Sequence, residues 1–439
     1  MKNVFDTIII GAGPGGYELA ANLAHKGENV AVIERGELGG TCLNRGCIPT
    51  KCLMATAEAV IKAREAEKLG VNVGEISVDF QKAVSRTCEV VASMQNGVAS
   101  LLKDCTVISG EARLLPDMQV AVGDEVYKTR RIVIATGSKP ALLPIEGAEL
   151  ALTSDEALYL DKLPESVVII GGGVIGMEFA SIFSALGVKT SVVEFCKEIL
   201  PPFDPEVAKR LRMGLSRRGV DIMVGAKVEK IIRKDGCLSV CYQGKKGPAE
   251  IDAETVIMAV GRKPVVPEGC VEAGISINAK GFIEVDMNME TSVPGIYAVG
   301  DVNGLSMLAH SAYAQGRVVA ESNPDLFNPY RVPSVVFTHP EVAMVGLTPQ
   351  LLDNAGDTYT SQKHMYAGNG KAQASGETDG FVKFLLTQPY GVIGGISIIG
   401  AHAADLIAEA TCLLDENLKP EQISAAHIHA HPTLSELFC

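Results

Sequence analysis

The sequence lacks the excess of positive charge that a protein needs to bind nucleic acid. Its 439 residues include 39 lysines and arginines against 52 aspartates and glutamates, which gives a formal net charge of -13. The isoelectric point is near 5.2. Because this balance repels phosphate backbones and anionic lipid headgroups, we expect neither nucleic acid nor a membrane surface as a partner.

The sequence also lacks a secretory signal and a disulfide framework. Its apolar start, residues 7–10, runs directly into glycines, and the 11 cysteines are scattered along the chain. Both features favour a reducing cytoplasm, where a close cysteine pair is more often catalytic or metal-binding than structural. We expect the other cysteines, including Cys52 and Cys196, to be buried packing residues, and expect no separate function for Cys439.

No uninterrupted apolar segment predicts a membrane span. Residues 167–188 are long enough and nearly all apolar, but they contain Glu178 and three consecutive glycines. We expect a buried strand followed by a packed helix there. An apolar fraction of 47% and a length of 439 residues predict a soluble globular protein of two or three domains.

The N-terminal segment predicts a βαβ unit that binds a dinucleotide. An unbroken apolar strand precedes the glycines Gly11, Gly13 and Gly16, a helix follows them, and Glu34 ends the next strand. Glycines allow the backbone to approach a pyrophosphate at the helix N-terminus, and the acid can accept hydrogen bonds from ribose hydroxyls.

The same pattern recurs about 160 residues later in the chain. Gly171, Gly173 and Gly176 follow a second apolar strand, and Glu194 occupies the matching acidic position. A carboxylate there repels a 2′-phosphate, so this second site is expected to prefer NAD to NADP. Two such units in one chain suggest that hydride passes between two bound dinucleotides.

Cys42 and Cys47 could form a zinc site, a structural disulfide or a redox pair. Zinc normally requires a second ligand pair, and the nearest rivals, Cys237 and Cys241, read as residues on one face of a strand. We therefore expect no metal. A disulfide needs irregular backbone between the two cysteines, which Gly46 and its neighbours can supply.

A helix is expected to begin close to Cys47, over residues 49–69, with a second one over residues 80–103. A helix N-terminus stabilises a thiolate, and Lys51 adds a positive charge one turn further on. This arrangement is typical of an exchangeable disulfide with one acidic thiol.

The segment "GGTCLNRGCIPTK", residues 39–51, resembles the redox-disulfide signature of the flavin-dependent pyridine nucleotide-disulfide oxidoreductases. Further resemblances to this family lie in "ATGSKP", "VGRKP", "TSVPGIYAVGD", "MLAH" and "VFTHPEVAMVG". The resemblance implies an α/β protein with two Rossmann-like domains, for FAD and NAD, and a C-terminal α+β dimerisation domain. The expected boundaries give an FAD domain over 1–144, an NAD domain over 145–266, a second FAD or central segment over 267–332, and an interface domain over 333–439.

The family's cofactor residues carry over to matching positions of this chain. FAD is expected to contact Gly11, Gly13, Gly16, Glu34, Thr41, Lys51, Thr136, Gly137, Asp301 and His310. NAD is expected to contact Gly171, Gly173, Gly176, Glu194 and Gly261. The resemblance also pairs Lys51 with Glu178 near the flavin.

Within the family, "HAHPTLSE" resembles the C-terminal signature of the dihydrolipoamide dehydrogenase branch. An imidazole beside a carboxylate is held in one tautomer and made more basic, so His431 with Glu436 is the expected general base. His429 is expected to have a supporting role. The branch implies a lipoyl carrier protein as partner; the rivals are an NADPH-linked disulfide reductase and a catalytically idle flavoprotein.

The branch further implies a homodimer in which His431 and Glu436 complete the partner's active site. The apolar stretch over residues 391–414 offers surface for such an interface. The alternative is that this stretch forms the core of the C-terminal domain.

Overall fold

A computed structural model describes residues 3–439, which divide into two compact units. The first unit comprises residues 3–50, 85–141 and 262–329, and the second comprises residues 51–84, 142–261 and 330–439. Each unit is therefore assembled from three separate stretches of chain. The four-part division expected from the sequence stays a prediction.

The first unit is built on a seven-stranded sheet whose central strand, β1, is parallel to both of its neighbours. Ile8 and Ile9 of β1 have no exposed surface, which explains why the strand is apolar on both faces. The strands are β1 (Val4–Ile10), β2 (Val30–Glu34), β3 (Thr106–Ser109), β4 (Ala112–Leu115), β5 (Gln119–Val122), β6 (Glu125–Ile134) and β17 (Ile296–Ala298). A separate antiparallel pair joins β7 (Ser138–Pro140) to β16 (Arg262–Pro264).

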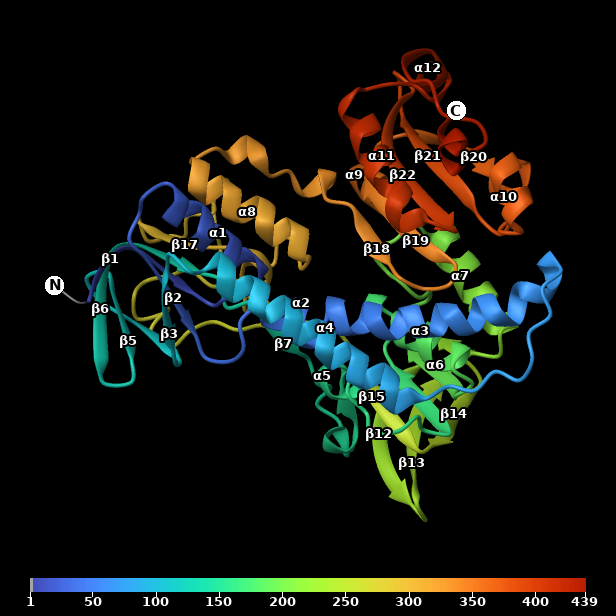
Figure 1. The fold of residues 1–439 in the computed structure, drawn as a ribbon, viewed down its shortest axis with the longest axis horizontal. Helices are drawn as coiled ribbons and strands as arrows, with labels where there is room; N and C mark the ends of the chain where they lie inside the picture. The colour runs from blue at the N-terminus through green and yellow to red at the C-terminus, as the bar shows by residue number, and fades with distance from the viewer. Residues whose placement is uncertain (1–2) are drawn as a thin grey trace. The chain divides into compact units, whose positions relative to one another are not determined.

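Two helices of the first unit, α1 (Pro14–His25) and α8 (Ala309–Glu321), lie side by side although almost 300 residues separate them (Figure 1). Glycines make this approach possible. A methyl group added at Gly15 would lie 3.3 Å from Ala312 Cβ, and one added at Gly316 would lie 3.4 Å from the Gly15 carbonyl oxygen. The close packing holds α8 against the helix that begins at the first glycine turn.

The second unit contains a parallel sheet of five strands around the second glycine turn. Residues 167–188 form strand β9 and helix α6, as expected, and no helix within residues 3–439 is both long and apolar enough to cross a membrane. The strands are β8 (Leu152–Thr153), β9 (Ser166–Ile170), β10 (Lys189–Glu194), β11 (Asp221–Val224) and β15 (Thr255–Met258). The helices are α5 (Ser154–Ala157), α6 (Val174–Ala185) and α7 (Pro205–Arg217).

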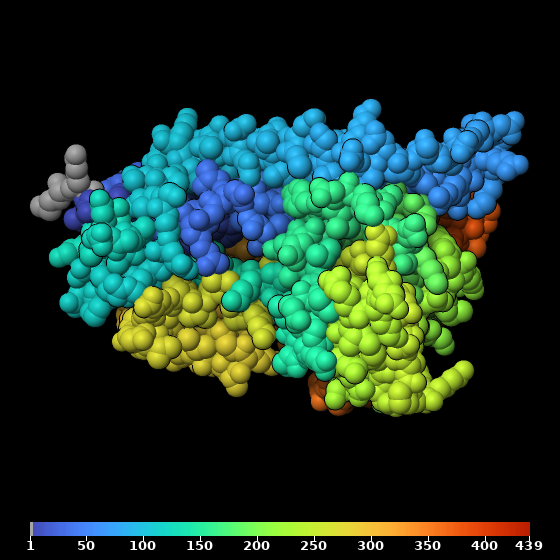
Figure 2. Space-filling model, turned by 90° about the horizontal axis from the view of Figure 1, so that it is seen from below, coloured from blue at the N-terminus to red at the C-terminus, as the bar shows by residue number. Residues whose placement is uncertain are grey.

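A three-stranded antiparallel sheet of β12 (Lys227–Lys234), β13 (Cys237–Gly244) and β14 (Gly247–Ala253) follows in the same unit. Figure 1 and Figure 2 show this sheet in yellow-green. Cys237 and Cys241 both lie on β13 four residues apart, so they share one face of the strand as predicted.

The C-terminal part of the second unit is an antiparallel sheet covered by helix α11, which confirms the expected α+β character. The strands are β18 (Ser334–Val336), β19 (Glu341–Gly346), β20 (Tyr359–Met365), β21 (Phe381–Thr387) and β22 (Val392–Gly400). The helices are α9 (Pro349–Ala355), α10 (Gly370–Ser375), α11 (Ala403–Asp415), α12 (Pro420–Ala426) and the 3₁₀ helix η7 (Leu434–Phe438).

The apolar stretch over residues 391–414 is the core of this C-terminal part. Strand β22 lies between β19 and β21, and Ile396, Ile398 and Ile399 are almost fully buried there. Helix α11 buries Leu406 and Ile407 against the same sheet. The stretch therefore gives no support to the interface that we considered from the sequence.

The two long helices expected after the cysteine pair are present. Helix α3 (Cys47–Glu65) continues as a 3₁₀ turn (Ala66–Leu69) and ends at Gly70, and helix α4 spans Phe80–Leu101. Because α3 begins two residues earlier than predicted, Cys47 is its first residue. The short helix α2 (Gly40–Arg45) precedes it.

The expectation that the other cysteines are buried is wrong for Cys88 and Cys412, which are exposed. Helix α11 explains the second case. Its core face carries Leu406, Ile407 and Ala410, and Cys412 lies two residues beyond Ala410, on the side turned to solvent. Cys52 is buried as expected, whereas Cys196 is only partly buried.

A buried ion pair joins α7 to strand β21 and predicts a large stability effect. Lys383 Nζ lies 2.8 Å from Asp204 Oδ2, and the two side chains are 9% and 0% exposed. Lys383→Ala leaves a buried carboxylate without its partner, so we expect a loss of about 3–5 kcal/mol in the free energy of unfolding. Urea denaturation followed by circular dichroism measures it.

Lys363→Ala is the matched control for this prediction. Lys363 pairs with Glu206 at 2.6 Å, but its side chain is 39% exposed, and such surface pairs contribute about 0–1 kcal/mol. If the two variants lost the same free energy of unfolding, burial would not explain the contribution of the Lys383–Asp204 pair.

Candidate active site

The two glycine turns have the same geometry. Gly11 and Gly171 adopt φ angles of +105° and +108°, which favour glycine. A methyl group on Gly11 would overlap the Ala135 carbonyl, and one on Gly171 would overlap the Ala259 carbonyl. Each turn therefore needs glycine because the neighbouring backbone approaches too closely for any side chain.

The acids at the ends of β2 and β10 bind their glycine turns in the same way. Glu34 accepts hydrogen bonds from the backbone N–H groups of Ala12 and Gly36, both at 2.7 Å. Glu194 accepts from Gly172 at 2.5 Å and from Cys196 at 2.6 Å. A carboxylate offers about four acceptor positions, so both acids retain capacity for ribose hydroxyls.

A cavity of about 440 Å³ opens beside the first turn. Its walls include Gly11, Glu34, Arg35 and Thr136, and all of its lining residues belong to the first unit. This volume lies in the range of small-molecule sites, and a carboxylate for ribose hydroxyls stands at its wall. The residues present therefore fit the adenosine portion of FAD.

Helix α2, which carries Cys42, is held directly against this turn. Gly39 donates its backbone N–H to the Ala12 carbonyl at 2.8 Å. A methyl group on Gly40 would lie 2.6 Å from Gly13 Cα, so only glycine allows the contact. The contact fixes the cysteine-bearing helix to the predicted phosphate-binding backbone.

Gly46 brings the two cysteine-bearing segments together at the end of α2. A methyl group there would lie 2.9 Å from the Thr41 carbonyl oxygen and 3.3 Å from Cys42 Cα. The residue before Cys47 therefore packs directly on the backbone of Cys42. This is the irregular backbone that a disulfide between close cysteines requires.

Asn44 of α2 ties this helix to the residues that precede it, a role that was not predicted from the sequence. Its buried side chain donates to the carbonyls of Leu38 and Gly40 at 3.0 and 2.9 Å and accepts from Gln95 at 2.7 Å. The sequence showed a polar residue between two cysteines, which could have marked Asn44 as structurally important, but it did not show which groups Asn44 would bind.

A tyrosine pair was also missed. The hydroxyls of Tyr17, on α1, and Tyr313, on α8, lie 2.5 Å apart. Burial raises the pKa of both hydroxyls, and the charge of the Cys42 thiolate contributes to the rise. The tyrosine pair therefore lies close enough to Cys42 for their charges to interact.

Asp301, the expected ribityl contact, stands at the end of a hydrogen-bond chain. Arg262 donates to the Ser138 hydroxyl at 2.7 Å, and that hydroxyl lies 2.5 Å from Asp301 Oδ2. Burial raises the pKa of Asp301, while Ser138 and Arg262 act in the opposite direction. Ser138 and Arg262 lie in the segments ATGSKP and VGRKP that resemble the family, but no role was predicted for either residue.

Lys51 and Glu178 meet as expected. Lys51 Nζ lies 3.1 Å from Glu178 Oε1, with side-chain exposures of 33% and 7%. Phe337 supports both residues, because its ring centre lies 4.1 Å from the ammonium and its backbone N–H donates to Glu178 at 3.0 Å. Phe337 lies in the segment VFTHPEVAMVG, which resembles the family, but the resemblance gave this residue no role.

His431 and Glu436 also meet, with His431 Nδ1 2.9 Å from Glu436 Oε1. The hydrogen bond from His431 lowers the pKa of Glu436, and the backbone N–H of Thr433 adds to the effect. The imidazole is 79% exposed, so its second nitrogen is accessible to another molecule. An exposed histidine oriented by a carboxylate can act as a general base.

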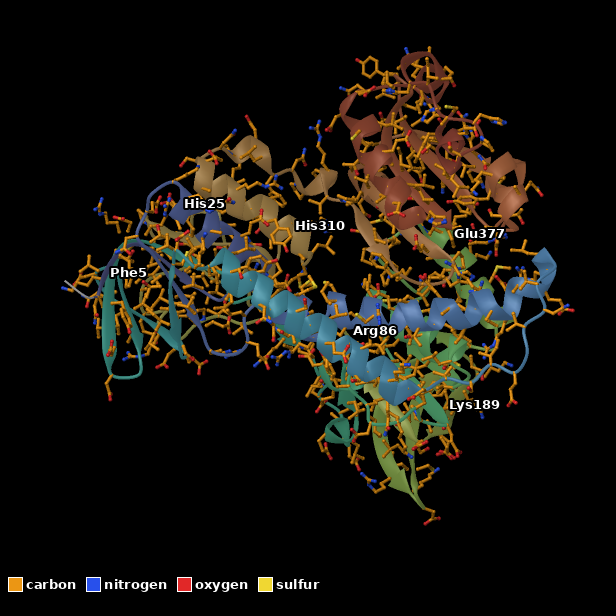
Figure 3. The ribbon with its side chains drawn as sticks, viewed as in Figure 1. Phe5, His25, Arg86, Lys189, His310 and Glu377 are labelled. Atoms are coloured by element: carbon orange, nitrogen blue, oxygen red, sulfur yellow. The ribbon has the colours of Figure 1, made fainter. Side chains whose placement is uncertain are left out.

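The predicted site residues divide between the two units. The first unit holds Gly11, Gly13, Gly16, Glu34, Thr41, Cys42, Cys47, Thr136, Gly137, Asp301 and His310. The second unit holds Lys51, Gly171, Gly173, Gly176, Glu178, Glu194, Gly261, His431 and Glu436. His310 lies in the first turn of α8, where its side chain is exposed (Figure 3). Within residues 3–439 no cluster of three or more side chains could hold a metal ion.

Comparison with known protein families gives two matches that together span most of the chain. Residues 5–316 match the family described as pyridine nucleotide-disulphide oxidoreductase. Residues 332–439 match the dimerisation domain of the same family.

Curated relatives are similar over nearly the whole length. The dihydrolipoyl dehydrogenase of Geobacillus stearothermophilus is 37% identical over 443 residues, which cover 98% of this chain and 94% of the relative. The dihydrolipoyl dehydrogenase of Bacillus subtilis is 36% identical with the same coverage. Among solved structures, the HOCl-induced flavoprotein disulfide reductase RclA from Escherichia coli, as its Cu(II) complex, matches with a TM-score of 0.87 at 29% identity, covering 99% of both chains.

The contact at Gly46 predicts the behaviour of the cysteine pair. Gly46→Ala forces the Cys42 backbone away from the added methyl group, and overpacking of this kind costs about 1–3 kcal/mol. We expect a smaller fraction of air-oxidised chains to contain the Cys42–Cys47 disulfide, as measured by peptide mass spectrometry after alkylation. Gly97→Ala is the control, because a methyl group there meets nothing within 4 Å. A wild-type disulfide fraction in Gly46→Ala would refute the role of the contact.

Proposed function

This chain belongs to the pyridine nucleotide-disulphide oxidoreductase family, and we propose that it works as a dihydrolipoamide dehydrogenase. It is an FAD- and NAD-dependent oxidoreductase that oxidises dihydrolipoyl groups and passes their electrons to NAD⁺. The observation that carries the proposal is the attachment of the Cys42-bearing helix to the first glycine turn through Gly40 and Gly13. The identity to two dihydrolipoyl dehydrogenases over the full chain supports the choice of substrate.

The cysteines and His431 perform two successive thiol–disulfide exchanges. His431 removes the proton from one dihydrolipoyl thiol, and the thiolate attacks the Cys42 sulfur of the Cys42–Cys47 disulfide. That bond breaks and Cys47 leaves as a thiolate. The second dihydrolipoyl thiol then attacks the mixed disulfide, which releases the oxidised lipoyl group and the Cys42 thiol.

The positions of the two cysteines in the helices agree with their different roles in the exchange. Cys47 is the first residue of α3, where the helix N-terminus favours its thiolate form as the leaving group. Cys42 lies within α2 and takes the exchange with the substrate. FAD, when bound, accepts the electron pair from the reduced cysteines and supplies hydride to NAD⁺.

The other site residues bind and orient the cofactors. The first glycine turn, Glu34 and Asp301 hold FAD, with Thr41, Thr136, Gly137 and His310 as further contacts. Lys51, which Glu178 and Phe337 hold in place, would supply a positive charge to bound FAD. The second glycine turn, Glu194 and Gly261 hold NAD.

The substrate and coenzyme assignments are tested together by initial-rate measurements on the FAD-loaded enzyme. We expect dihydrolipoamide to reduce NAD⁺ with a kcat/KM at least about tenfold above that for NADP⁺, because one unfavourable charge contact of about 1.4 kcal/mol gives this ratio. Glu194→Gln removes the negative charge, so it should raise kcat/KM for NADP⁺ more than kcat/KM for NAD⁺. Glu250→Gln, an exposed substitution on β14, is the control.

The rival assignment makes a different prediction in the same assay. The likeness to RclA, a flavoprotein disulfide reductase, keeps open the first rival considered from the sequence, a disulfide reductase linked to NADPH. Such an enzyme would reduce oxidised glutathione with NADPH faster than it reduces lipoamide with NADH. That result would replace the proposed activity. An FAD-loaded protein inactive with every thiol substrate would instead favour the idle flavoprotein.

The partners follow from the proposed activity. The substrate is a lipoyl group on a carrier protein of a multienzyme complex, and the protein acts in the cytoplasm. The matched dimerisation domain supports a homodimer. We further propose that His431 and Glu436 of one subunit act on Cys42 and Cys47 of the partner, because the imidazole is oriented by its carboxylate and is exposed to solvent.

Mixing two inactive variants tests the shared site. Cys42→Ser chains lack the exchanging sulfur, and His431→Ala chains lack the base. After subunit exchange, a heterodimer holds one intact site and one doubly altered site, so about half of the wild-type activity per heterodimer should return. Exchange is verified by mass spectrometry of differently tagged chains, and its completion without any activity would show that each subunit uses its own histidine.

A further inference from the structure

A second group of ionisable side chains lies near the His431–Glu436 pair and is not used in the proposed reaction. Cys439 Sγ lies 3.0 Å from His429 Nδ1. On the other side of the ring, His429 Nε2 lies 2.5 Å from Glu409 Oε1. The three residues come from different places in the fold: Glu409 from α11, His429 from the segment after α12, and Cys439 from the segment after η7.

The order of these groups is thiol, imidazole and carboxylate. The carboxylate of Glu409 accepts a hydrogen bond from the proton-bearing Nε2, so Nδ1 presents its lone pair to the Cys439 thiol. Such an arrangement allows the imidazole to take the proton of the thiol, which turns the sulfur into a nucleophile. The chain thus brings together an activated thiol and its orienting groups.

Burial differs along this triad in the way that a reactive thiol needs. The His429 side chain is 10% exposed and the Glu409 side chain 31% exposed, whereas Cys439 is exposed. The base is therefore held in place while the sulfur is accessible from solvent. The backbone N–H of Cys439 also donates to the Glu436 carbonyl at 3.2 Å, which fixes the position of the residue.

The triad is separate from the proposed general base. His431 is oriented by Glu436, whereas His429 is oriented by Glu409, so each imidazole has its own carboxylate. Both carboxylates add negative charge near Cys439. A neutral reagent is therefore expected to react in preference to an anionic one.

We propose that Cys439, His429 and Glu409 form a thiol-modification site that reacts with small neutral disulfides. The Cys439 thiol transfers its proton to His429, and its sulfur attacks one sulfur of the disulfide R–S–S–R. A Cys439–S–S–R bond forms and the R–S–S–R bond breaks. The departing R–S⁻ takes the proton from His429, so the Cys439 sulfur is oxidised and one R–SH is produced by reduction of the reagent.

Cys412 provides a reference thiol within the same protein. It is exposed on α11, in the same unit, and no hydrogen-bond partner of its thiol is found within residues 3–439. Its rate therefore reports the reactivity of an ordinary surface cysteine.

The experiment treats the FAD-loaded enzyme with bis(2-hydroxyethyl) disulfide between pH 6 and pH 9. Remaining thiols are blocked with N-ethylmaleimide, and peptide mass spectrometry gives the rate at each cysteine. At pH 7 we expect Cys439 to react at least about tenfold faster than Cys412, because an ordinary thiol is only a few per cent ionised there. The ratio of the two rates should be larger at pH 7 than at pH 9, because ordinary thiols become largely ionised at the higher pH without the help of a base.

Two variants test the roles of the supporting residues. His429→Asn should reduce the Cys439 rate to that of Cys412 and give it the same pH dependence. Glu409→Gln should give an intermediate rate, and the Cys412 rate should be unchanged in both variants.

Equal rates and equal pH profiles for Cys439 and Cys412 in the unaltered protein would overturn the proposal. This comparison needs no variant, so it decides the question even where a substitution prevents folding. A fast Cys439 that is unaffected in a folded His429→Asn protein would also overturn it.

Discussion

The contact between Gly40 and Gly13 is the constraint on which the proposed active site depends. A methyl group on Gly40 would lie 2.6 Å from Gly13 Cα, and the neighbouring Gly39 donates its backbone N–H to Ala12. The helix that carries Cys42 is therefore packed directly on the backbone that is proposed to bind the FAD pyrophosphate. Asn44 restrains the same helix through side-chain hydrogen bonds to the Leu38 and Gly40 carbonyls, so these contacts place the helix without involving the cysteine side chains.

The two βαβ units show how one backbone design can serve two purposes. Their glycine turns and their acids, Glu34 and Glu194, make equivalent backbone contacts. The units differ in the segment that comes after the second strand. After β2 the chain enters the cysteine-bearing helices, whereas after β10 it enters a loop with Phe195 exposed to solvent. Of the two βαβ units, therefore, only the first is followed directly by the pair Cys42 and Cys47, which could exchange electrons with a dinucleotide bound there.

The sequence predicted the features that depend on local pattern. Strand β9 and helix α6 follow from an apolar run interrupted by glycines, and both acidic positions follow from their spacing to the turns. The sequence could not show contacts between distant segments, which is why Ser138, Arg262 and Phe337 were missed. The apolar run at residues 391–414 was open to two interpretations because hydrophobicity does not reveal which surface covers a strand. Cys88 and Cys412 were misjudged for a related reason, since a small residue can occupy either face of an amphipathic helix.

The central claim is that Cys42 and Cys47 store an electron pair in addition to the pair that FAD can accept. An anaerobic titration with dithionite, followed by absorbance, measures this capacity directly. The account predicts uptake of about four electrons per FAD in the wild-type protein and about two in Cys47→Ser, because a disulfide is a two-electron couple. Uptake of only about two electrons per FAD by fully oxidised wild-type protein would show that the cysteines are not a redox pair and would contradict the account.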